Sequence, residues 1–272
     1  MPYMNKSSAA ALFALALLSA PSIAAANPSF VADGDLSVCN DPTFPPMEFK
    51  QNAGDANPVG VDVEVATALA ELWGAKASFV TMDFNGLLPS LSAERCDVII
   101  SGITLTAERQ KTFDAVGYLN TFVVIIGKAG APALAGPEDL ADKTVAVQSG
   151  TTYLTRMEKL NEALAAKGLA PMVIQQYPKQ TDAIQQLEVG RVIGVVTQDT
   201  EVAFREFEKP GQFATIWTVP QDAVEPYSVY LRKNEADKAE VAKGVATLLS
   251  SGKLREIADK WKLSPKQLEG IQ

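Results

Sequence analysis

The stretch Asp97-Val-Ile-Ile-Ser-Gly-Ile-Thr-Leu-Thr-Ala-Glu-Arg109 decides the fold that we predict for this chain. Its first five residues are mostly apolar, which is typical of a strand buried on both faces of a parallel sheet. Ser101 and Gly102 end this strand, and Thr106 is placed to cap a helix with Arg109 in its first turn. Amides, hydroxyl groups and a guanidinium therefore meet at the C-terminal end of a strand, where α/β proteins bind ligands.

Strand-like and helix-like patterns of apolar residues alternate on both sides of this stretch. The alternation predicts βαβ units, in which helices flank a mostly parallel sheet. Prolines interrupt the pattern at 132–137, and the same organisation starts again at residue 144. We therefore expect an α/β protein of two lobes with a ligand cleft between them. The expected strands are 36–40, 76–82, 97–101, 144–148, 173–177 and 192–197, and the expected helices are 63–73, 85–93, 152–167, 181–189 and 200–207.

Several boundaries of these elements follow from single residues. Asp62 is expected to cap the first helix and Gly74 to end it. Residues 121–127 are apolar without a helical period, and prolines interrupt the strand character of 215–231. Two amphipathic helices, separated by Gly252, are expected after residue 236.

The composition excludes several classes of function. The 272 residues include no histidine, which removes catalytic triads that need histidine and histidine-ligated zinc or haem. Two cysteines are too few for a four-thiolate metal site, and we expect no cofactor. With 24 basic and 32 acidic residues the net charge is −8, the wrong sign for binding nucleic acid over a broad surface. No oligomerisation signal is evident, so we expect a monomer.

The first 26 residues have the pattern of a secretory signal peptide. Lys6 gives a positive start, residues 9–18 are almost entirely apolar, and Ala24-Ala25-Ala26 supplies the small residues that signal peptidase accepts. The apolar run has about half the length of a membrane-spanning helix, so a permanent anchor is the weaker interpretation. We expect the mature protein to begin near Asn27 and to reside in the periplasm.

Cys39 and Cys96 would then lie in an oxidising compartment, where neighbouring thiols form disulfides. They fall within or just before the predicted strands 36–40 and 97–101. If these strands are parallel and their C-terminal ends are level, the cysteines start about 10 Å apart. A disulfide would need an offset in register, so a bridge and two buried thiols remain equally open.

Three further segments complete a pattern with the stretch quoted first. They are Gly60-Val-Asp-Val-Glu-Val65, Val147 to Thr152, and Gly-Lys-Leu-Arg-Glu-Ile-Ala-Asp-Lys-Trp at 252–261. The four segments together resemble the periplasmic solute-binding proteins of family 3, although Val61 and Trp73 depart from the usual pattern. The resemblance spans most of the mature chain and implies that the protein delivers a polar amino acid or a related small carboxylate to an ABC importer.

The resemblance also implies a two-lobe fold of the type II periplasmic-binding-protein class. By analogy, the chain would cross between the lobes near 118–121 and again near 220–225. The first lobe would consist of 27–119 together with 224–272, and the second lobe of 120–223. Ligand would be captured when the two lobes close over it.

The resemblance assigns the ligand's α-carboxylate to Arg109, with Ser101, Gly102 and Thr104 beside it. A guanidinium binds a carboxylate through two parallel hydrogen bonds, which suits this role. From the residues alone, a solvated arginine in the first turn of a helix is the simpler interpretation. The family match favours the ligand instead.

Phe44 and Phe84 match the two aromatic positions that enclose the ligand side chain in this family, and core packing is the alternative for both. Asp41 matches the position that contacts the distal polar end of the ligand. Its alternative role is that of a turn aspartate before Pro42. Glu48 lies nearby in the sequence and is expected at the solvated surface.

In the second lobe, Gln148, Gly150, Thr151 and Thr152 match a turn from strand to helix whose amides bind the same carboxylate. Capping of the following helix by a threonine is the alternative, and both roles are compatible. These residues complete the set that the resemblance places around the carboxylate.

One departure from the family bears on the ligand. The aspartate that usually receives the ligand's α-ammonium is replaced here by Gln198, and Ile193 replaces another usual aspartate. A neutral amide cannot offset the charge of a buried ammonium. Either Asp199 or Glu225 takes this role, or the ligand is not a standard α-amino acid.

Two alternatives to a transport-linked binding protein remain. An enzyme on the same fold, such as a periplasmic dehydratase acting on a small carboxylic acid, would need an acid and a base other than histidine. Glu48, Asp199 and Lys179 are the candidates, and none lies in a catalytic motif. The second alternative is a sensor accessory that passes its closure to a receptor.

Overall fold

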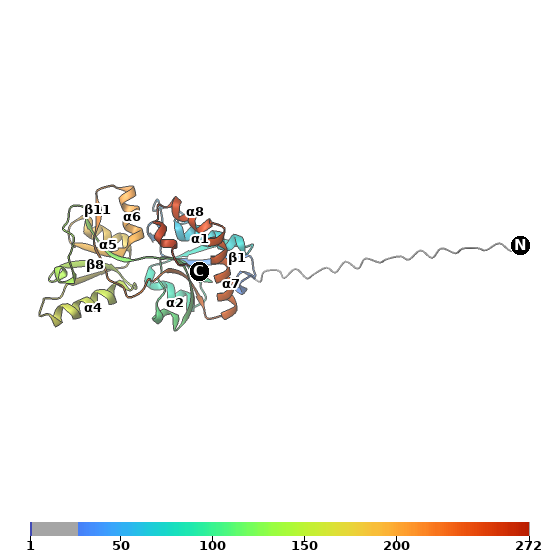
Figure 1. Ribbon diagram of the computed structural model, residues 1–272, viewed down its shortest axis with the longest axis horizontal. Helices are drawn as coiled ribbons and strands as arrows, with labels where there is room; N and C mark the ends of the chain where they lie inside the picture. The colour runs from blue at the N-terminus through green and yellow to red at the C-terminus, as the bar shows by residue number, and fades with distance from the viewer. Residues whose placement is uncertain (2–26, 272) are drawn as a thin grey trace.

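The computed structural model describes Met1 and residues 27–271. The predicted signal peptide at 1–26, apart from Met1, lies outside the described residues. Two five-stranded sheets, each with helices against it, form the two halves of the fold (Figure 1). A small third sheet pairs β2 (Thr43–Phe44) with β3 (Glu48–Phe49). The predicted α/β class with two lobes is confirmed.

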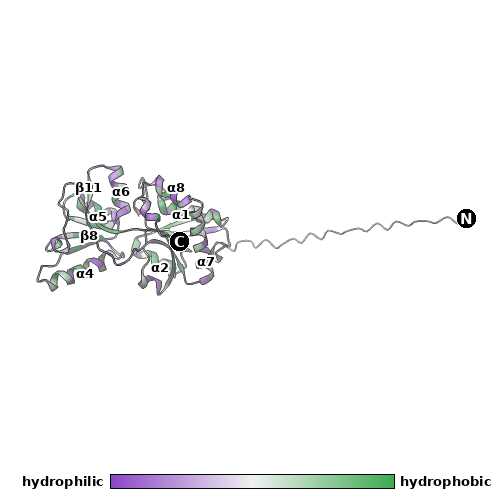
Figure 2. Ribbon diagram, in the orientation of Figure 1, coloured by the Kyte–Doolittle hydropathy of each residue, from purple (hydrophilic) through white to green (hydrophobic). Residues whose placement is uncertain are grey.

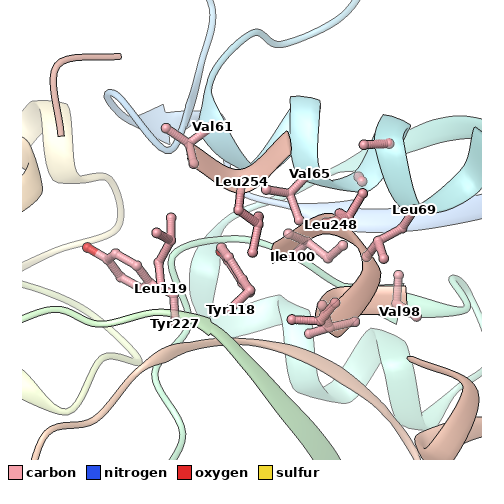
Figure 3. Packing of buried hydrophobic residues seen from close by; sticks show 14 of the residues in the cluster. Val61, Val65, Leu69, Val98, Ile100, Tyr118, Leu119, Tyr227, Leu248 and Leu254 are labelled. Carbon is pink, nitrogen blue, oxygen red and sulfur yellow. The ribbon is translucent and has the colours of Figure 1, made fainter. Parts of the chain in front are cut away.

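The first large sheet contains, in order, β4 (Lys76–Thr81), β1 (Asp35–Asn40), β5 (Val98–Ile99), β12 (Tyr227–Arg232) and β6 (Phe113–Leu119). Its helices are α1 (Val61–Leu72), α2 (Leu87–Ser92), α3 (Ala107–Gln110), α7 (Glu235–Ser250) and α8 (Lys253–Lys260). Successive side chains of a strand point to opposite faces. Val98 and Ile100 therefore pack in one apolar cluster with α1, α7 and α8, whereas Ile99 packs in another with α2. Figure 3 shows the first cluster, which includes Tyr118 and Tyr227.

The second large sheet contains, in order, β11 (Phe213–Thr218), β7 (Val123–Lys128), β10 (Gly194–Gln198), β8 (Thr144–Gln148) and β9 (Val173–Tyr177). Its helices are α4 (Tyr153–Ala166), α5 (Gln180–Glu188) and α6 (Asp199–Glu208). The same alternation applies, because Val145 and Val147 pack with α4 while Ala146 packs with α5. Four short 3-10 helices complete the fold: Ser29–Val31, Phe84–Gly86, Pro137–Leu140 and Pro265–Leu268.

The chain passes from the first large sheet to the second between β6 and β7, and it returns between β11 and β12. A strand that leads out of a sheet and a strand that leads back into it run in opposite directions. Accordingly, β12 is antiparallel to β5 and β6, and β7 is antiparallel to β10 and β11. Each sheet is therefore mixed, with two parallel and two antiparallel pairings, where the sequence led us to expect mostly parallel sheets.

The start of α1 differs from the prediction that Asp62 caps it. The N-cap residue is Gly60, with φ 135°, and a Cβ there would lie 2.3 Å from the carbonyl oxygen of Met47. Only glycine fits this position. The carboxylate of Asp62 instead accepts hydrogen bonds from the amide of Gly102 and the hydroxyl of Tyr118. Asp62 thus links the start of α1 to Gly102, which follows β5 in the chain.

Cys39 and Cys96 form a disulfide, with their Cα atoms 5.7 Å apart. Cys39 is level with Ile99 in the parallel pairing of β1 with β5. The chain bends at Asp97 instead of continuing as a strand, so Cys96 does not lie three extended residues further along the sheet. This bend supplies the offset that the sequence left open.

Most buried residues are apolar. The ribbon of Figure 2 shows hydrophobic and hydrophilic residues together along helices such as α4. Within residues 27–271, no helix combines the length and the apolar character that crossing a membrane requires.

Candidate functional site

A small cavity of about 10 Å³ lies between the two halves and is lined by residues from both. Strand ends and helix starts from the two halves meet here, because parallel strands direct their C-terminal ends to the same edge. Nine of the residues predicted from the sequence line this cavity: Phe44, Phe84, Gly102, Thr104, Arg109, Gln148, Thr151, Thr152 and Gln198. Tyr153, which we did not predict, lines it as well.

Arg109 is the charged residue of the lining. Thr106 caps the short helix α3, and its hydroxyl accepts a hydrogen bond of 3.2 Å from the Arg109 amide, as predicted. The guanidinium donates through Nη1 to the carbonyl of Thr104 at 2.9 Å and through Nη2 to the carbonyl of Gly150 at 3.4 Å. Burial lowers the pKa of Arg109, yet a guanidinium keeps its charge at neutral pH. Two of its five N–H donors make these contacts, which leaves donors for an anion.

Two phenylalanines border the cavity from the first half. Phe84 lies near Arg109, whose Cζ is 5.9 Å from the centroid of the ring. Phe44 packs edge-on against Tyr227, with centroids 6.4 Å apart, and is also part of the core. A Cβ at Gly102, where φ is +50°, would lie 2.7 Å from the Phe44 ring. Glycine at this position therefore lets the aromatic ring lie against the strand end.

Asp41, Ser101 and Glu48 lie behind the cavity lining in a row of hydrogen bonds. The Asp41 amide donates to the hydroxyl of Ser101 at 2.9 Å, and that hydroxyl donates to Oε1 of Glu48 at 2.8 Å. Glu48 is fully buried, so our expectation of a solvated glutamate was wrong. The loop between β1 and α1 folds back over the strand ends and carries Glu48 inward.

Glu48 and Asp62 are two carboxyl groups buried side by side beneath the cavity. Burial raises the pKa of both, and the neighbouring Asp62 raises the pKa of Glu48 further. Hydrogen bonds from Gly102 and Tyr118 support the charge on Asp62. The arrangement therefore favours the neutral form of Glu48.

Gln148 connects the two halves at one end of the cavity. Its side-chain amide donates to Oδ2 of Asp41 at 2.6 Å and to the carbonyl of Pro178 at 3.2 Å. Burial raises the pKa of Asp41 to about 6, while hydrogen bonds, including that from Gln148, act in the opposite direction. Asp41 itself does not line the cavity.

The start of α4 approaches the first half closely. Gly150 has φ +80°, and a Cβ there would lie 2.8 Å from Cα of Asn85. The N-cap of α4 is Thr152, whose side chain makes no capping hydrogen bond, although the hydroxyl of the preceding Thr151 accepts from the Tyr153 amide at 3.3 Å. Both threonines line the cavity. The positive end of the α4 dipole and the Arg109 guanidinium thus face the same space, which favours an anion.

The structure places Gln198 and Asp199 differently. Gln198 lines the cavity, and its Oε1 accepts a 2.8 Å hydrogen bond from the hydroxyl of Tyr227. Asp199 does not line it. Its carboxylate accepts hydrogen bonds from the Thr121 hydroxyl, the Phe122 amide and the side chain of Gln267, at 3.0 to 3.1 Å. Asp199 therefore binds residues 121–122, the crossing segment through which the chain passes from the first sheet to the second, and does not contribute to the cavity lining.

Sequence reasoning missed Tyr153 and Tyr227. Tyr153 is the first residue of α4 and directly follows the predicted turn, so its position beside that turn was a usable signal. Tyr227 lies on β12, far in sequence from Gln198, although Glu225, a candidate for binding an ammonium, is two residues away. Only the return of the chain to the first sheet brings it to Gln198.

The chain is similar in sequence and fold to known amino-acid-binding proteins. The L-arginine-binding protein of Pseudomonas aeruginosa is 28% identical over 257 residues, which cover 91% of this chain and 95% of that protein. A solved ancestral arginine-binding protein bound to arginine is 30% identical with a TM-score of 0.74, over 84% of this chain and 98% of that chain.

Two further solved structures are similar. The substrate-binding protein of an amino acid ABC transporter is 31% identical, with a TM-score of 0.71 over 84% of this chain and 99% of that chain. An ancestral amino acid-binding protein, described as a precursor of cyclohexadienyl dehydratase, is 28% identical with a TM-score of 0.70, over 84% and 96% of the two chains. The model of the bacterial extracellular solute-binding proteins, family 3, matches residues 36–264, and the chain belongs to this family.

Proposed function

We propose that this protein captures a small solute by its carboxylate between the two lobes and delivers it to an ABC importer. The observation that carries the proposal is the charge of the cavity. Arg109 keeps donors free toward the space that the start of α4 faces from the other half. A carboxylate bound there would be held by a guanidinium and by the positive end of a helix dipole.

The proposed capture has two steps. The solute first binds Arg109, Gly102 and the two phenylalanines, all of the first lobe. The second lobe then closes over it through Thr151 and the rest of the α4 start. We propose 27–119 with 224–272 as one rigid body and 120–223 as the other, since the chain crosses between the sheets at these places. Closure signals loading only if the closed form binds the solute more tightly.

The proposed ligand class is a polar amino acid or a close derivative. The support is the family, together with the relatives whose names state arginine or amino acid binding. Phe44 and Phe84 would enclose the side chain of the ligand, since aromatic faces accept flat, aliphatic or cationic groups. The importer is the proposed partner, and we propose that the protein acts in the periplasm as a monomer after removal of residues 1–26, without a cofactor and without binding nucleic acid.

We further propose that the protein is not an enzyme. The three candidate acids or bases that the sequence offered are Glu48, Asp199 and Lys179, and none lines the cavity. Glu48 is buried behind Ser101, and Asp199 is hydrogen-bonded to the crossing segment. A general acid or base must reach the bound substrate.

Calorimetric titration of the mature protein tests the proposal. The protein is unfolded and refolded to remove bound ligand, then titrated with the standard amino acids and with their deaminated carboxylic acids. At least one carboxylate should bind, and Arg109→Ala should weaken it at least about 100-fold, because two charged hydrogen bonds are lost. Arg255→Ala, which removes an exposed arginine of α8, is the control. Binding that survives Arg109→Ala would overturn the proposal, as would silence across the whole panel.

A further inference from the structure

The orientation of the Gln198 side chain determines what it offers to a ligand. The hydroxyl of Thr200 lies 2.7 Å from that of Tyr227, and the Tyr227 hydroxyl donates to Oε1 of Gln198 at 2.8 Å. The amide oxygen is therefore occupied. The amide nitrogen Nε2 makes no hydrogen bond within the described part of the chain, although Gln198 is only 2% exposed. The amide nitrogen of Gln198, a lining residue, thus has two N–H donors without a partner in residues 27–271, while the amide oxygen already accepts one hydrogen bond.

The acidic side chains around the cavity all have other partners. Glu225 forms an ion pair of 2.7 Å with Arg156, and Asp199 holds the crossing segment. Glu201 bonds Gln180 and Arg205. These contacts remove the two carboxylates that could have replaced the aspartate that is missing at position 198.

Asp41 is the remaining acid. Its Oδ2 accepts the bond from Gln148, its Oδ1 is buried without a hydrogen-bond partner among the described residues, and Asp41 does not line the cavity. Among the described residues that line the cavity, Arg109 is accordingly the sole charged group. The lining carries one positive charge and no negative charge.

We infer that the ligand is a carboxylic acid with a keto or hydroxyl oxygen, and not an ammonium, on the carbon next to the carboxylate. The inference rests on the proposed function, because it assumes that the carboxylate binds Arg109. An oxygen at the α position accepts a hydrogen bond from Nε2 of Gln198, whereas an ammonium would direct its own donors at those of the amide. A monoanion also matches the single positive charge of the lining, while a zwitterion buries a cation without a counter-charge.

Matched sets of ligands test the inference. The mature protein, unfolded and refolded as above, is titrated with an amino acid and with the α-keto and α-hydroxy acids that carry the same side chain. The sets are phenylalanine with phenylpyruvate and phenyllactate, leucine with α-ketoisocaproate and α-hydroxyisocaproate, glutamate with α-ketoglutarate and α-hydroxyglutarate, and arginine with α-keto-δ-guanidinovalerate. In any set that binds, the keto or hydroxy acid should bind about 100-fold more tightly than the amino acid.

The variant Gln198→Glu is the matched test of the residue itself. It keeps the length of the side chain, so one carboxylate oxygen can accept the Tyr227 hydrogen bond while the other faces the cavity. Binding of the keto acid should fall at least about tenfold and binding of the matching amino acid should rise. Arg255→Ala is again the control, and a melting curve shows whether the variant folds.

The outcomes separate the inference from the proposed function. Tighter binding of an amino acid than of its keto and hydroxy analogues, lost in Arg109→Ala, overturns the inference and leaves the proposed function standing. Binding of neither kind of acid overturns both. If Gln198→Glu does not fold, the ratio measured for the unchanged protein decides alone.

Discussion

The side-chain amide of Gln148 donates a 2.6 Å hydrogen bond to the carboxylate of Asp41, and the two residues lie at strand ends of different sheets. Gln148 is the last residue of β8, and Asp41 directly follows β1. This bond joins the halves of the protein beside the cavity. Closure therefore involves contacts between the lobes themselves in addition to contacts with a ligand.

Replacement of Gly150 by alanine should impede closure. The new Cβ would lie 2.8 Å from the backbone of Asn85 in the other half, so the lobes could not approach as closely. Gly168→Ala is a matched control, because Gly168 also has a positive φ, +71°, but has nothing within 4 Å of the added Cβ. Both variants should lose about 1 kcal/mol of stability from backbone strain. Only Gly150→Ala should weaken ligand binding at least about tenfold in calorimetry. Equal affinities of the two variants would contradict this prediction.

Asp41→Asn should be more stable than the unchanged protein at neutral pH. The pKa of Asp41 is about 6 in the folded protein, above the ordinary value of 3.8, because burial disfavours the charged form. Its contribution to stability is thus fully present below about pH 4 and is lost as the pH rises through about 6. Urea unfolding measures the free energy of unfolding of both proteins at about pH 4 and about pH 7.5. The advantage of Asp41→Asn over the unchanged protein should grow by up to about 3 kcal/mol from the lower to the higher pH. A difference that does not change with pH would show that Asp41 is not buried as described.

Loss of the disulfide should destabilise the protein strongly. The bond closes a loop between residues 57 apart in the sequence, Cys39 and Cys96. On the chain-entropy estimate, a loop of this length contributes about 4 kcal/mol by restricting the unfolded chain. Urea unfolding with and without a reductant should show this loss in the unchanged protein. The double variant Cys39→Ser/Cys96→Ser should have the stability of the reduced protein, both with and without reductant. A change in its stability on adding reductant would contradict the prediction.

The two buried carboxyl groups should respond differently to substitution. Burial and the nearby Asp62 raise the pKa of Glu48, which favours its neutral form, so the neutral substitution Glu48→Gln should change the unfolding free energy by less than about 1 kcal/mol. Asp62→Ala leaves the Gly102 amide and the Tyr118 hydroxyl without an acceptor. It should cost about 3 kcal/mol in urea unfolding at neutral pH. Equal losses of unfolding free energy in the two variants would contradict the view that Asp62 carries the charge and Glu48 is neutral.

Most elements could be predicted because their hydrophobic period is local. The helix predicted at 152–167 is α4 at Tyr153–Ala166, and the strand predicted at 173–177 is β9 with the same bounds. The strand predicted at 97–101 is only Val98–Ile99, because a bend at Asp97 sets the disulfide. Such a bend depends on a partner that lies far away in the sequence.

The site could be predicted only in part. Two of the family motifs contain six residues of the cavity lining, because these motifs lie where a strand ends and a helix starts. Phe44, Phe84 and Gln198 were indicated by single positions that match the family. The burial of Glu48 and the contact of Tyr227 with Gln198 could not be foreseen. Both result from segments that fold back over the strand ends, and no local pattern records where such a segment arrives.

The sequence by itself determined the α/β class and the secretory pattern, because composition and local periodicity are sufficient for these. The carboxylate-binding role of Arg109 is implied only by the family resemblance and stays a proposal. Only the tertiary structure decided which acids remain free to meet a ligand. Asp199 is next to Gln198 in the sequence, yet its carboxylate accepts a hydrogen bond from the distant Gln267. Glu225 lies where the chain returns to the first sheet, yet it forms an ion pair with the distant Arg156. A charge becomes available or unavailable through its neighbours in space, and the charge of this cavity is therefore a property of the fold.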